Sequence, residues 1–547
     1  MIKAWILPLC MFMSGYNGIV TELALFQLAE ALIGSTISNL LYTMGIMMFA
    51  MGVGALLAHG KFVKNASIGL FLQLEMILAL IVSLSIPAIT LICGNTAIIS
   101  PTLVFILFSF AIGCLIGMEI PIMQKIISID SGKDIQGIAS SVMMADYFGS
   151  LMGFVLFTLY LLHSHGIAFS TMSAAFANLI SASLILLFYK KQVLSKDKFV
   201  VLASAILLGS IAFNLENVMK KAEQMLFEKK IIWSKQTPYQ HLVLTDNQQT
   251  GNPRYEKLKY QKHMKDLKKV EPSPFGNSAY ELLKDRKNNY SLYINGGLQF
   301  NTYDEKHYHE FLVHPAMSLN PNAKHVLVLG GGDGLAIREL AHYDSIESIT
   351  LVDIDKAMME AFATQPLLRE INKNALNDPR LKIVVMDAWK FVRFNEKQYD
   401  MAILDFPDPH HSSTAKLYSQ QFYQYLKSSL SKEAIIITQS TSPLLDRRAY
   451  LCIRKTLQAS GFNVLSTHIE MESFFQWGFQ LASLHRSENE IKKALENFNS
   501  DLNLEYLHRD SLESSWLWSK NFFIEKSPIP VNDFMKLPLL KLYNSNK

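Results

Sequence analysis

The chain has 547 residues, of which 50% are hydrophobic and only 18% are charged, and its net charge is +4. Soluble proteins carry about 25% charged residues, so part of this chain is not expected to lie in water. The near balance of charge argues against a nucleic-acid-binding protein, since such proteins are usually strongly basic. The four cysteines are too few for a disulfide scaffold and lack the spacing of a metal site.

The charges are divided unevenly along the chain. Residues 1–214 contain nine Lys, no Arg and eight acidic residues. Seven apolar runs, each close to the roughly 17–25 residues that cross a bilayer, follow one another at about 4–28, 36–58, 66–92, 98–122, 139–162, 166–189 and 199–214. One such run could be a signal peptide, but a succession of them cannot. We therefore predict an N-terminal, all-α, polytopic transmembrane domain over 1–214.

The lysines predict how this domain is oriented. Lys3 precedes the first run, and the others follow the second, fourth and sixth runs: Lys61, Lys64, Lys125, Lys133, Lys190, Lys191, Lys196 and Lys198. Positively charged loops stay in the cytoplasm, so the N-terminus and these loops are predicted there. If 199–214, the shortest run, also spans, the rest of the chain lies outside. If it lies in the interface or re-enters, the rest stays inside.

Four acidic residues lie within or at the edges of the runs: Glu22, Glu30, Glu75 and Glu119. Carboxylates inside a membrane are costly and are candidates for function. A transport or cation-conducting role is one interpretation. The other is a hydrogen bond within the helix bundle or a position at the end of a span.

The segment after the runs is polar and changes character twice. Residues 215–236 have the pattern of an amphipathic connector, and a small β region is predicted over 237–300, with strands near 239–245 and 291–295. Between these strands lies an insertion over 247–288 that contains Lys257, Lys259, Lys262, Lys265, Lys268 and Lys269. We expect a solvated loop, with contact to anionic lipid headgroups as the alternative.

Strands and helices alternate over 301–487, ahead of a tail region at 488–547. The strands are near-continuous apolar runs such as HVLVLG, SITLVD and YDMAILD, which predicts an α/β domain with a doubly wound parallel sheet. Ligands of such sheets bind at the carboxyl ends of the strands. Four strands carry an acidic residue at that end: Asp333, Asp353, Asp387 and Asp405.

These positions favour two kinds of ligand chemistry. Gly330 and Gly332 allow a tight turn against a ligand, Asp353 can accept hydrogen bonds from ribose hydroxyls, and Asp387 with Ala388 can bind an adenine amino group. Together they indicate an adenosine ligand, and no lysine in this register would grip a triphosphate.

The remaining acids point to a cation. Asp333, Asp405 and Asp408 form a carboxylate-lined rim that suits a polycationic organic substrate. Mg²⁺ is the alternative by ligand type, although nothing here supplies a phosphate partner for it. The adjacent His410 and His411 lack a carboxylate at ligand spacing, and we expect no metal site.

Several motifs occur in an order that resembles one family. They are YQHLVL, NGGLQFNTYDEKHYHEFLVHP, VLVLGGGDG, LVDID, DPR, MDA, YDMAILDFPDP, LYSQQFY and ITQSTSP, across about 238–485. This pattern resembles the polyamine aminopropyltransferases (spermidine synthases), and more narrowly their membrane-fused branch. The resemblance implies a class I methyltransferase-like Rossmann domain and decarboxylated S-adenosylmethionine as cosubstrate.

The resemblance also implies a role for each matching residue. Gln240, Asp353, Asp387 and Ala388 would contact the methylthioadenosine part of the cosubstrate. His309 and Asp333 would hold amine groups with Tyr308 beside them, Asp405 would accept the proton, and Asp408 would bind the diamine. The chemistry agrees, because an alkylamine is protonated at neutral pH and must lose a proton before it attacks carbon. The cosubstrate's leaving group needs neither an acid nor a metal.

Three positions depart from the family pattern. Asn295 stands where soluble members usually have Asp, Ser440-Thr441-Ser442 follow Gln439 where several putrescine-using members have an acid, and His411-Ser412 replace Gly-Pro. These departures leave the acceptor amine open, with putrescine the first choice.

Two other functions are considered. One is an S-adenosylmethionine methyltransferase, whose cofactor carboxylate would face Asp333. The other is a polyamine transporter or sensor whose soluble half binds polyamines without catalysing a reaction.

We expect a multi-pass protein of the cell membrane. Its catalytic half is expected in the cytoplasm, where the cosubstrate is made, against a strict seven-span lysine count. The resemblance implies a homodimer or homotetramer.

Overall fold

The computed structural model describes residues 3–33, 37–95, 99–131, 135–237, 239–251, 289–525 and 527–545. The chain divides into two compact units. The first comprises Met1–Asp285 with Tyr293–Gly297, and the second Arg286–Leu292 with Leu298–Lys547. The predicted insertion at 247–288 lies outside the described residues from 252 onward, as do the six lysines named above.

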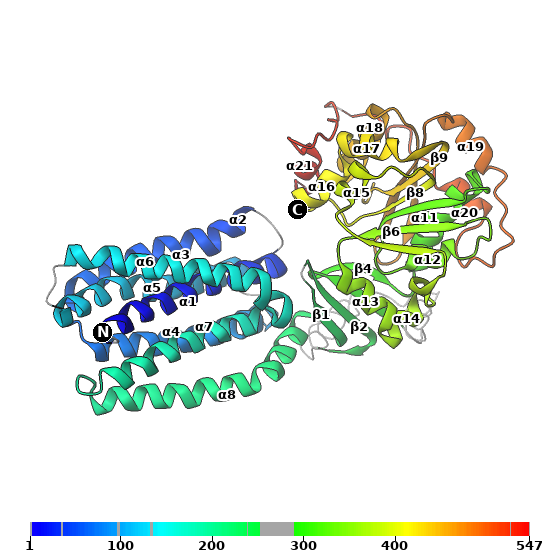
Figure 1. The fold of residues 1–547 in the computed structure, drawn as a ribbon. Coiled ribbons are helices and arrows are strands. Elements are labelled where there is room, and N and C mark those ends of the chain that lie inside the picture. The colour runs from blue at the N-terminus through cyan, green and yellow to red at the C-terminus, as the bar shows by residue number, and fades with distance from the viewer. Residues whose placement is uncertain are drawn as a thin grey trace, which may run out of the picture. The chain divides into compact units, whose positions relative to one another are not determined.

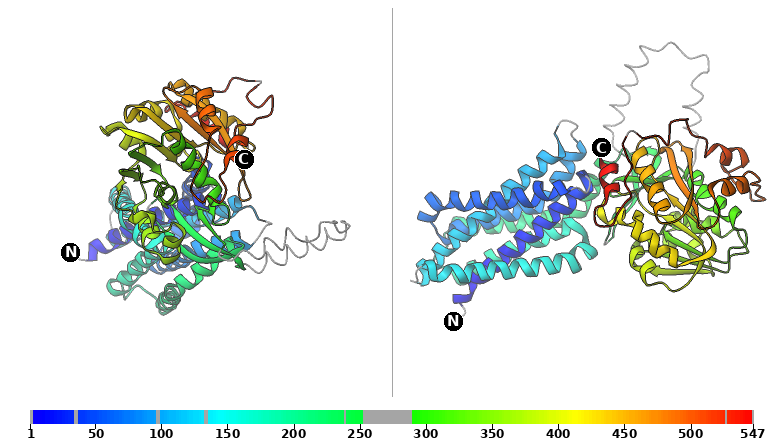
Figure 2. Two further views of the ribbon diagram at one scale, coloured as in Figure 1. Left: turned by 90° about the vertical axis from the view of Figure 1, so that its right-hand side faces the viewer. Right: turned by 90° about the horizontal axis from the view of Figure 1, so that it is seen from above.

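The first unit is dominated by long helices that run side by side (Figures 1 and 2). They are α1 (Lys3–Ile33), α2 (Ile37–Leu40), α3 (Ile46–Leu57), α4 (Ile68–Asn95), α5 (Pro101–Ser131), α6 (Ile135–Leu156), α7 (Leu162–Phe188) and α8 (Ser195–Leu226). Single π-helical turns at Leu41–Gly45, Ala58–Phe62 and Phe157–Leu161 extend α3 and α6.

Seven of these stretches are long and apolar enough to cross a membrane: Trp5–Ile33, Leu41–Gly60, Ile68–Gly94, Pro101–Asp130, Ile138–Leu161, Ser164–Phe188 and Ser195–Leu226. The predicted all-α domain with seven apolar helices is confirmed. The seventh is longer than the run at 199–214 indicated. α8 continues through 226 because 215–226 also has helical periodicity, so the expected connector at 215–236 is divided between this helix and a strand.

Glycines bring two of the helices together. A Cβ atom on Gly54 of α3 would lie 2.0 Å from the carbonyl oxygen of Cys114, and one on Gly117 of α5 would lie 2.0 Å from that of Met51. Real Cβ atoms cannot approach so closely, so any larger residue would separate α3 from α5. Small residues commonly allow such close contact between apolar helices.

A small antiparallel sheet follows, with the order β1-β2-β3-β4. Its strands are β1 (Lys229–Gln236), β2 (His241–Thr250), β3 (Tyr290–Ile294) and β4 (Gly297–Asn301). β3 and β4 are joined by Asn295-Gly296, both with positive φ, as a two-residue hairpin turn requires.

The second unit contains a seven-stranded sheet with the order β10-β11-β9-β8-β5-β6-β7. The strands are β5 (His325–Gly330), β6 (Ser348–Asp353), β7 (Leu381–Val385), β8 (Tyr399–Asp405), β9 (Leu430–Gln439), β10 (Asn463–Met471) and β11 (Phe475–Ser483). β5 to β9 pair in parallel, whereas β11 is antiparallel to β9 and β10. The predicted α/β doubly wound domain with a small preceding β region is confirmed.

Helices cover this sheet and place the site. They are α11 (Glu305–Leu319), α12 (Leu335–Leu340), α13 (Lys356–Thr364), α14 (Pro366–Ile371), α15 (Ala388–Phe394), α16 (Ser412–Ala415), α17 (Gln420–Ser428), α18 (Arg447–Ala459), α19 (Glu488–Leu495), α20 (Arg509–Ser514) and α21 (Pro538–Asn544). In the sheet, β6 and β7 lie on one side of β5, whereas β8 and β9 lie on its other side. Such a switch point opens a crevice at the carboxyl ends of the strands, between β5 and β8.

Candidate active site

The end of β5 is a glycine turn that can only be built close to β8. Gly330 pairs with Asp405 in the parallel register. Gly330 and Gly331 have φ of +80° and +67°, and a Cβ on Gly330 would lie 2.2 Å from the carbonyl oxygen of Asp405. Glycine at 330 therefore serves both a backbone conformation that larger residues avoid and the close approach of the two strands. The turn places Asp333 on the same side as Asp405.

Four predicted side chains meet at this crevice. One ligand atom each of His309, Asp333 and Asp405 lies within 4.8 Å of the other two, and the Tyr308 hydroxyl donates a 2.6 Å hydrogen bond to Oδ1 of Asp405. Tyr308 and His309 come from the first turns of α11, whereas the aspartates follow β5 and end β8. This grouping could hold a metal ion or an organic ammonium group, since both take oxygen and nitrogen ligands.

The site is an anionic cluster balanced by one histidine. Burial raises the pKa of Asp405 above the usual range of an aspartate, against the lowering effects of His309 and the Tyr308 hydroxyl. Burial, joined by the charge of Asp405, likewise raises the pKa of Asp333 to about 6 although His309 opposes it. Burial would lower the pKa of His309, but the hydrogen bond and charge of Glu305 raise it above its ordinary value. His309 therefore favours its cationic form beside the acids.

A buried chain of charges beneath His309 was not predicted from the sequence. Nδ1 of His309 lies 2.7 Å from Oε2 of Glu305, whose two oxygens accept bonds of 2.8 and 2.9 Å from Arg338. Nε of Arg338 donates a 2.8 Å bond to Glu339, which also contacts His314. Burial opposes ionisation of Glu305, yet His309 and Arg338 hold its pKa down to about 2. Glu305 lies inside the DEKHYHE motif. Its short spacing from Tyr308 was the only sequence signal that it could take part in the site.

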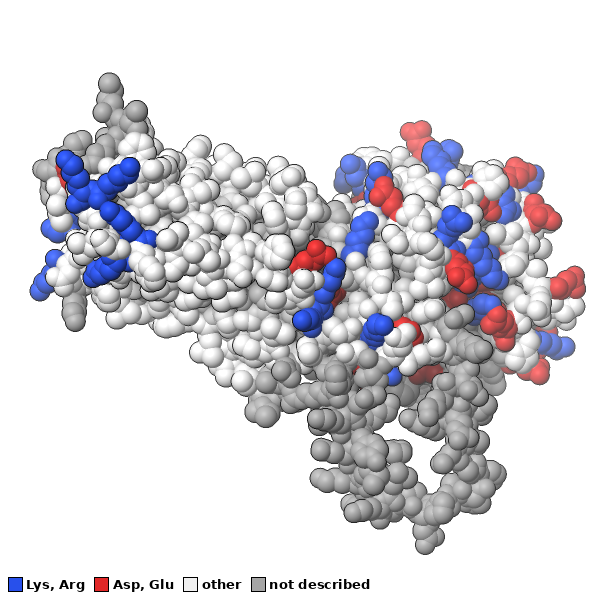
Figure 3. All heavy atoms as spheres, turned by 90° about the horizontal axis from the view of Figure 1, so that it is seen from below, with Lys and Arg blue, Asp and Glu red and all other residues white. Residues whose placement is uncertain are grey.

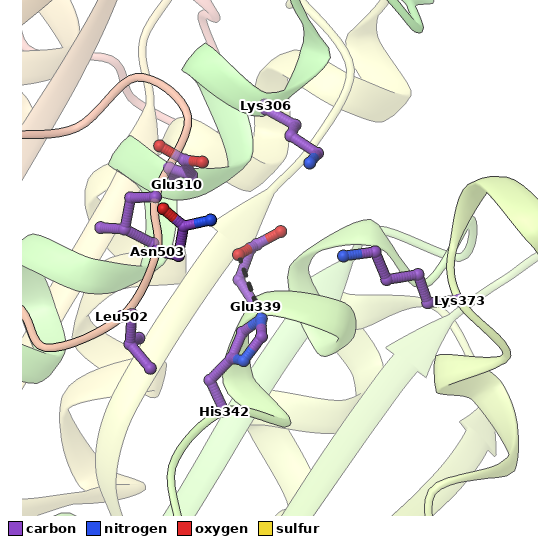
Figure 4. A pocket seen from close by; sticks show the side chains of 8 residues that line it. Lys306, Glu310, Glu339, His342, Lys373, Leu502 and Asn503 are labelled. Atoms are coloured by element: carbon purple, nitrogen blue, oxygen red, sulfur yellow. Dashed lines mark ion pairs between the residues drawn. The ribbon is translucent and has the colours of Figure 1, made fainter. Parts of the chain in front are cut away.

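The far end of this chain of charges borders a cavity of about 260 Å³, lined by Lys306, Glu310, Glu339, His342, Lys373 and Leu502–Leu504. Figure 4 shows Lys373 pointing toward Glu339, which is paired with His342. None of the predicted site residues lines this cavity.

The predicted adenosine residues lie at neighbouring strand ends. Oδ2 of Asp353 accepts a 3.1 Å bond from the amide of Gly332 and Oδ1 a 2.8 Å bond from that of Asp355, so this carboxylate holds the glycine turn. Burial raises its pKa to about 6. Asp387 caps α15, where Ala388 is buried, and its Oδ2 accepts a 2.7 Å bond from Lys416. Gln240 lies in the first unit, in the turn between β1 and β2, and its role stays a prediction.

Asp408 is held by residues to which the sequence analysis assigned no role. The Tyr543 hydroxyl of α21 donates a 2.7 Å bond to its Oδ2, and Nε2 of Gln439 lies 3.4 Å from its Oδ1. Gln439 also bonds to the hydroxyl of Tyr418 and donates a 2.7 Å bond to the carbonyl oxygen of Phe406. Residues far along the chain thus position a carboxylate in the loop after β8.

Comparison with known proteins identifies the chain. Residues 305–493 match the Spermine/spermidine synthase domain. The chain is 32% identical to polyamine aminopropyltransferase 2 of Aquifex aeolicus over 540 residues, 98% of both chains. It is 30% identical to the polyamine aminopropyltransferase of Leptospira interrogans over 534 residues, 96% of this chain and 95% of the relative. The chain belongs to the polyamine aminopropyltransferase family. The matches to these two relatives extend over the helical first unit.

A crystal structure of spermidine synthase in complex with the transition-state analogue AdoDATO matches with a TM-score of 0.41 and 22% identity, over 54% of this chain and 88% of that chain.

Two departures from the motifs of the aminopropyltransferase family have structural roles here. Asn295 has φ of +49°, and its Oδ1 accepts a 2.8 Å bond from the amide of His241. Asparagine tolerates this backbone conformation well. Thr441 has φ of +64°, and its amide donates a 3.0 Å bond to Oε1 of Gln439. Both positions are thus under backbone constraint.

Proposed function

We propose that this aminopropyltransferase moves the aminopropyl group of decarboxylated S-adenosylmethionine to putrescine, giving spermidine and methylthioadenosine, with Asp405 as the base. The convergence of Tyr308, His309, Asp333 and Asp405 at one strand switch point carries this proposal. Carboxylates without a phosphate-binding lysine suit an organic cation.

Asp405 performs two tasks in this mechanism. Its carboxylate first pairs with the ammonium group of the acceptor and then removes one proton, because only the free amine is a nucleophile. Tyr308 occupies Oδ1, which leaves Oδ2 to face the amine. The amine nitrogen then attacks the carbon beside the sulfonium. As the new C–N bond forms the C–S bond breaks, and the positive charge passes from sulfur to the new secondary ammonium.

Positioning supplies most of the remaining catalysis. Asp333 and His309 hold the amine of the aminopropyl group. Asp408 binds the amine of the diamine that does not react. Asp353, Asp387 and Ala388 bind the methylthioadenosine part over the turn of Gly330 and Gly332, and Gln240 is assigned to the same part of the cosubstrate. Lys416 must release or share Asp387 for this contact.

The proposed reaction does not require a metal, and EDTA is expected to leave the transfer rate unchanged. Loss of activity that Mg²⁺ restores would contradict this.

A mass-spectrometric transfer assay on the purified full chain tests the reaction. Decarboxylated S-adenosylmethionine is offered with putrescine, cadaverine or spermidine. Product from putrescine is expected, together with an equal amount of methylthioadenosine, and Asp405→Asn is expected to reduce the rate about 10³-fold. Product from a different amine would replace putrescine as acceptor. Absence of transfer to every amine would contradict the proposal.

We also propose that the first unit spans the cell membrane with the catalytic unit in the cytoplasm. Figure 3 shows a group of lysines at the left-hand end of the helical unit, and the middle of the unit presents an uncharged face on this side. Decarboxylated S-adenosylmethionine is made in the cytoplasm, which favours a catalytic unit there. The 32-residue α8 is long enough to span the membrane. A seventh span favours a catalytic unit outside the cell membrane. A reporter fused after Lys547 tests the orientation: activity only outside the cell membrane would overturn the cytoplasmic location.

The expected homodimer or homotetramer remains part of the proposal, and mass photometry of the detergent-solubilised chain tests it.

A further inference from the structure

Two buried carboxyl groups in the helical unit have no part in the proposed catalysis. Glu75 of α4 and Glu119 of α5 are both 0% exposed, and they interact electrostatically with each other. The Ser181 hydroxyl donates a 3.1 Å bond to Oε1 of Glu75, and the Ser14 hydroxyl donates to Oε2 of Glu119. The second oxygen of each carboxyl group, Oε2 of Glu75 and Oε1 of Glu119, has no hydrogen-bond partner among the described residues.

No positive group balances these acids within the part of the chain that the structure describes. The ion pairs found there do not involve Glu75 or Glu119. An isolated buried carboxylate is strongly unfavourable, and two neighbours repel each other as well. Helices that served only as an anchor would gain nothing from such a pair. Each of the two unpartnered oxygens can accept a hydrogen bond from a positively charged donor that comes from outside the chain.

A track of neutral polar groups adjoins the pair. Nδ2 of Asn17 donates a 3.0 Å bond to Oδ1 of Asn178, and the Thr21 hydroxyl donates a 2.9 Å bond to Oδ1 of Asn17. Nδ2 of Asn178 in turn lies 3.4 Å from the carbonyl oxygen of Glu75. All three side chains are buried. Ser14, Asn17 and Thr21 share one face of α1, at helical spacings of three and four.

We propose that the helical unit binds an alkylammonium ion, the protonated end of a polyamine, at Glu75 and Glu119. An ammonium group has three donors and no acceptor, which matches unpartnered carboxylate oxygens. Hard divalent ions require about six or more oxygen ligands, more than the two free carboxylate oxygens offer. The choice of a polyamine rests on the proposed function, because the second unit consumes one such amine and releases another. The first unit then has a second amine site, separate from the catalytic one.

Spermidine binding to the full chain tests the proposal. The protein is placed in nanodiscs of neutral phosphatidylcholine, so that lipid charge does not bind the amine, and labelled spermidine is measured by equilibrium dialysis. We expect two sites per chain in the wild type and one in Asp333→Asn/Asp405→Asn. Addition of Glu75→Gln/Glu119→Gln to that background is expected to weaken the remaining site at least tenfold. Glu30→Gln, at the end of the same bundle, is the matched control and is expected to leave it unchanged.

The transfer assay separates this proposal from the proposed function. Glu75→Gln/Glu119→Gln alone is expected to keep the transfer rate of the detergent-held protein, which also reports that the chain is folded. If the wild type catalyses transfer but Asp333→Asn/Asp405→Asn binds no spermidine, the second site is overturned, whatever the glutamine variants do. Residual binding that survives the glutamine substitutions overturns its assignment to Glu75 and Glu119. Proton uptake at the pair without amine binding also overturns the proposal.

Discussion

The crevice proposed as the catalytic site holds two neighbouring acidic side chains, and the ligand-free protein must accommodate their charge. Asp333 and Asp405 are close to each other and to His309, and burial raises the pKa of both aspartates. In the proposed mechanism, a cationic substrate removes this penalty when it binds. Binding and folding therefore make opposite demands on the same side chains, as in many active sites.

Asp333→Asn is expected to stabilise the ligand-free protein at neutral pH. The pKa of Asp333 in the folded chain is about 6, against 3.8 ordinarily, so folding favours the protonated form. Ionisation costs folding stability as pH rises from about 4 to about 6, and the cost is complete above that. Asparagine removes it, so the melting temperature should rise by about 2–4 °C at pH 8 and not at pH 4.

The exposed residue Asp344 provides the control for this prediction. Asp344→Asn should leave the melting temperature unchanged at both pH 4 and pH 8. An equal gain from Asp333→Asn at both pH values would contradict the argument, because it would not depend on ionisation.

Tyr308→Phe is expected to shift the pH dependence of transfer. The Tyr308 hydroxyl stabilises the charged form of Asp405 and so lowers the pKa of that carboxyl. Without it the pKa rises, and Asp405 acts as a base only at higher pH. The acid limb of kcat/KM should move to higher pH, with a rate loss of about tenfold at pH 7. A uniform loss at every pH would show that Tyr308 acts in another way.

At the level of elements, α11 is fixed to α12 by a buried ion pair. The two bonds of Arg338 to Glu305 are bidentate, and both side chains are almost fully buried. This contact holds the first turn of α11, and hence Tyr308 and His309, against the glycine turn that precedes α12. Tyr308 and His309 are thus positioned by charged groups to which the proposed mechanism assigns no contact with substrate.

Arg338→Lys is expected to lower the melting temperature by roughly 5–10 °C, since lysine cannot reproduce the bidentate pair and leaves buried acceptors unsatisfied. The exposed Arg369 is the control, and Arg369→Lys should have no such effect. Because the loss acts through His309, kcat should fall as well. A stable variant with full activity would show that the ion pair is dispensable.

At the level of the whole second unit, the C-terminal segment returns to the site. α21 supplies Tyr543, whose hydroxyl binds Asp408, and the amides of residues 505–507 bind Glu310 of α11. The tail region at 488–547 is therefore packed into the catalytic unit and influences a residue that the proposed mechanism assigns to the acceptor.

Tyr543→Phe is expected to raise KM for the acceptor amine about three- to tenfold with little change in kcat, because Asp408 loses the bond that orients it. The proposed mechanism assigns the methylthioadenosine part of the cosubstrate to other strand ends, so the KM of the cosubstrate should not change. Tyr425→Phe, at a more exposed tyrosine, is the control. An equal change in both KM values would contradict a role limited to the acceptor.

Local sequence patterns determined the architecture and the centre of the site. Apolar run length depends on neighbouring residues alone, so the seven helices could be predicted. Alternating strands and helices similarly predicted the parallel sheet, and acids at strand ends converge because parallel strands end at one edge. Asp333 and Asp405 could be placed together for that reason, and Tyr308 and His309 followed from a motif.

Only the tertiary structure decided which distant groups support these residues. Arg338 and Glu305 are 33 positions apart, and Tyr543 and Asp408 are 135 apart, distances over which no periodicity operates. Glu75, Glu119, Asn17 and Asn178 come from four different helices, and sequence identified the acids without showing which groups face them. Partners of this kind depend on how elements pack, and packing is a property of the folded chain rather than of any local stretch of sequence.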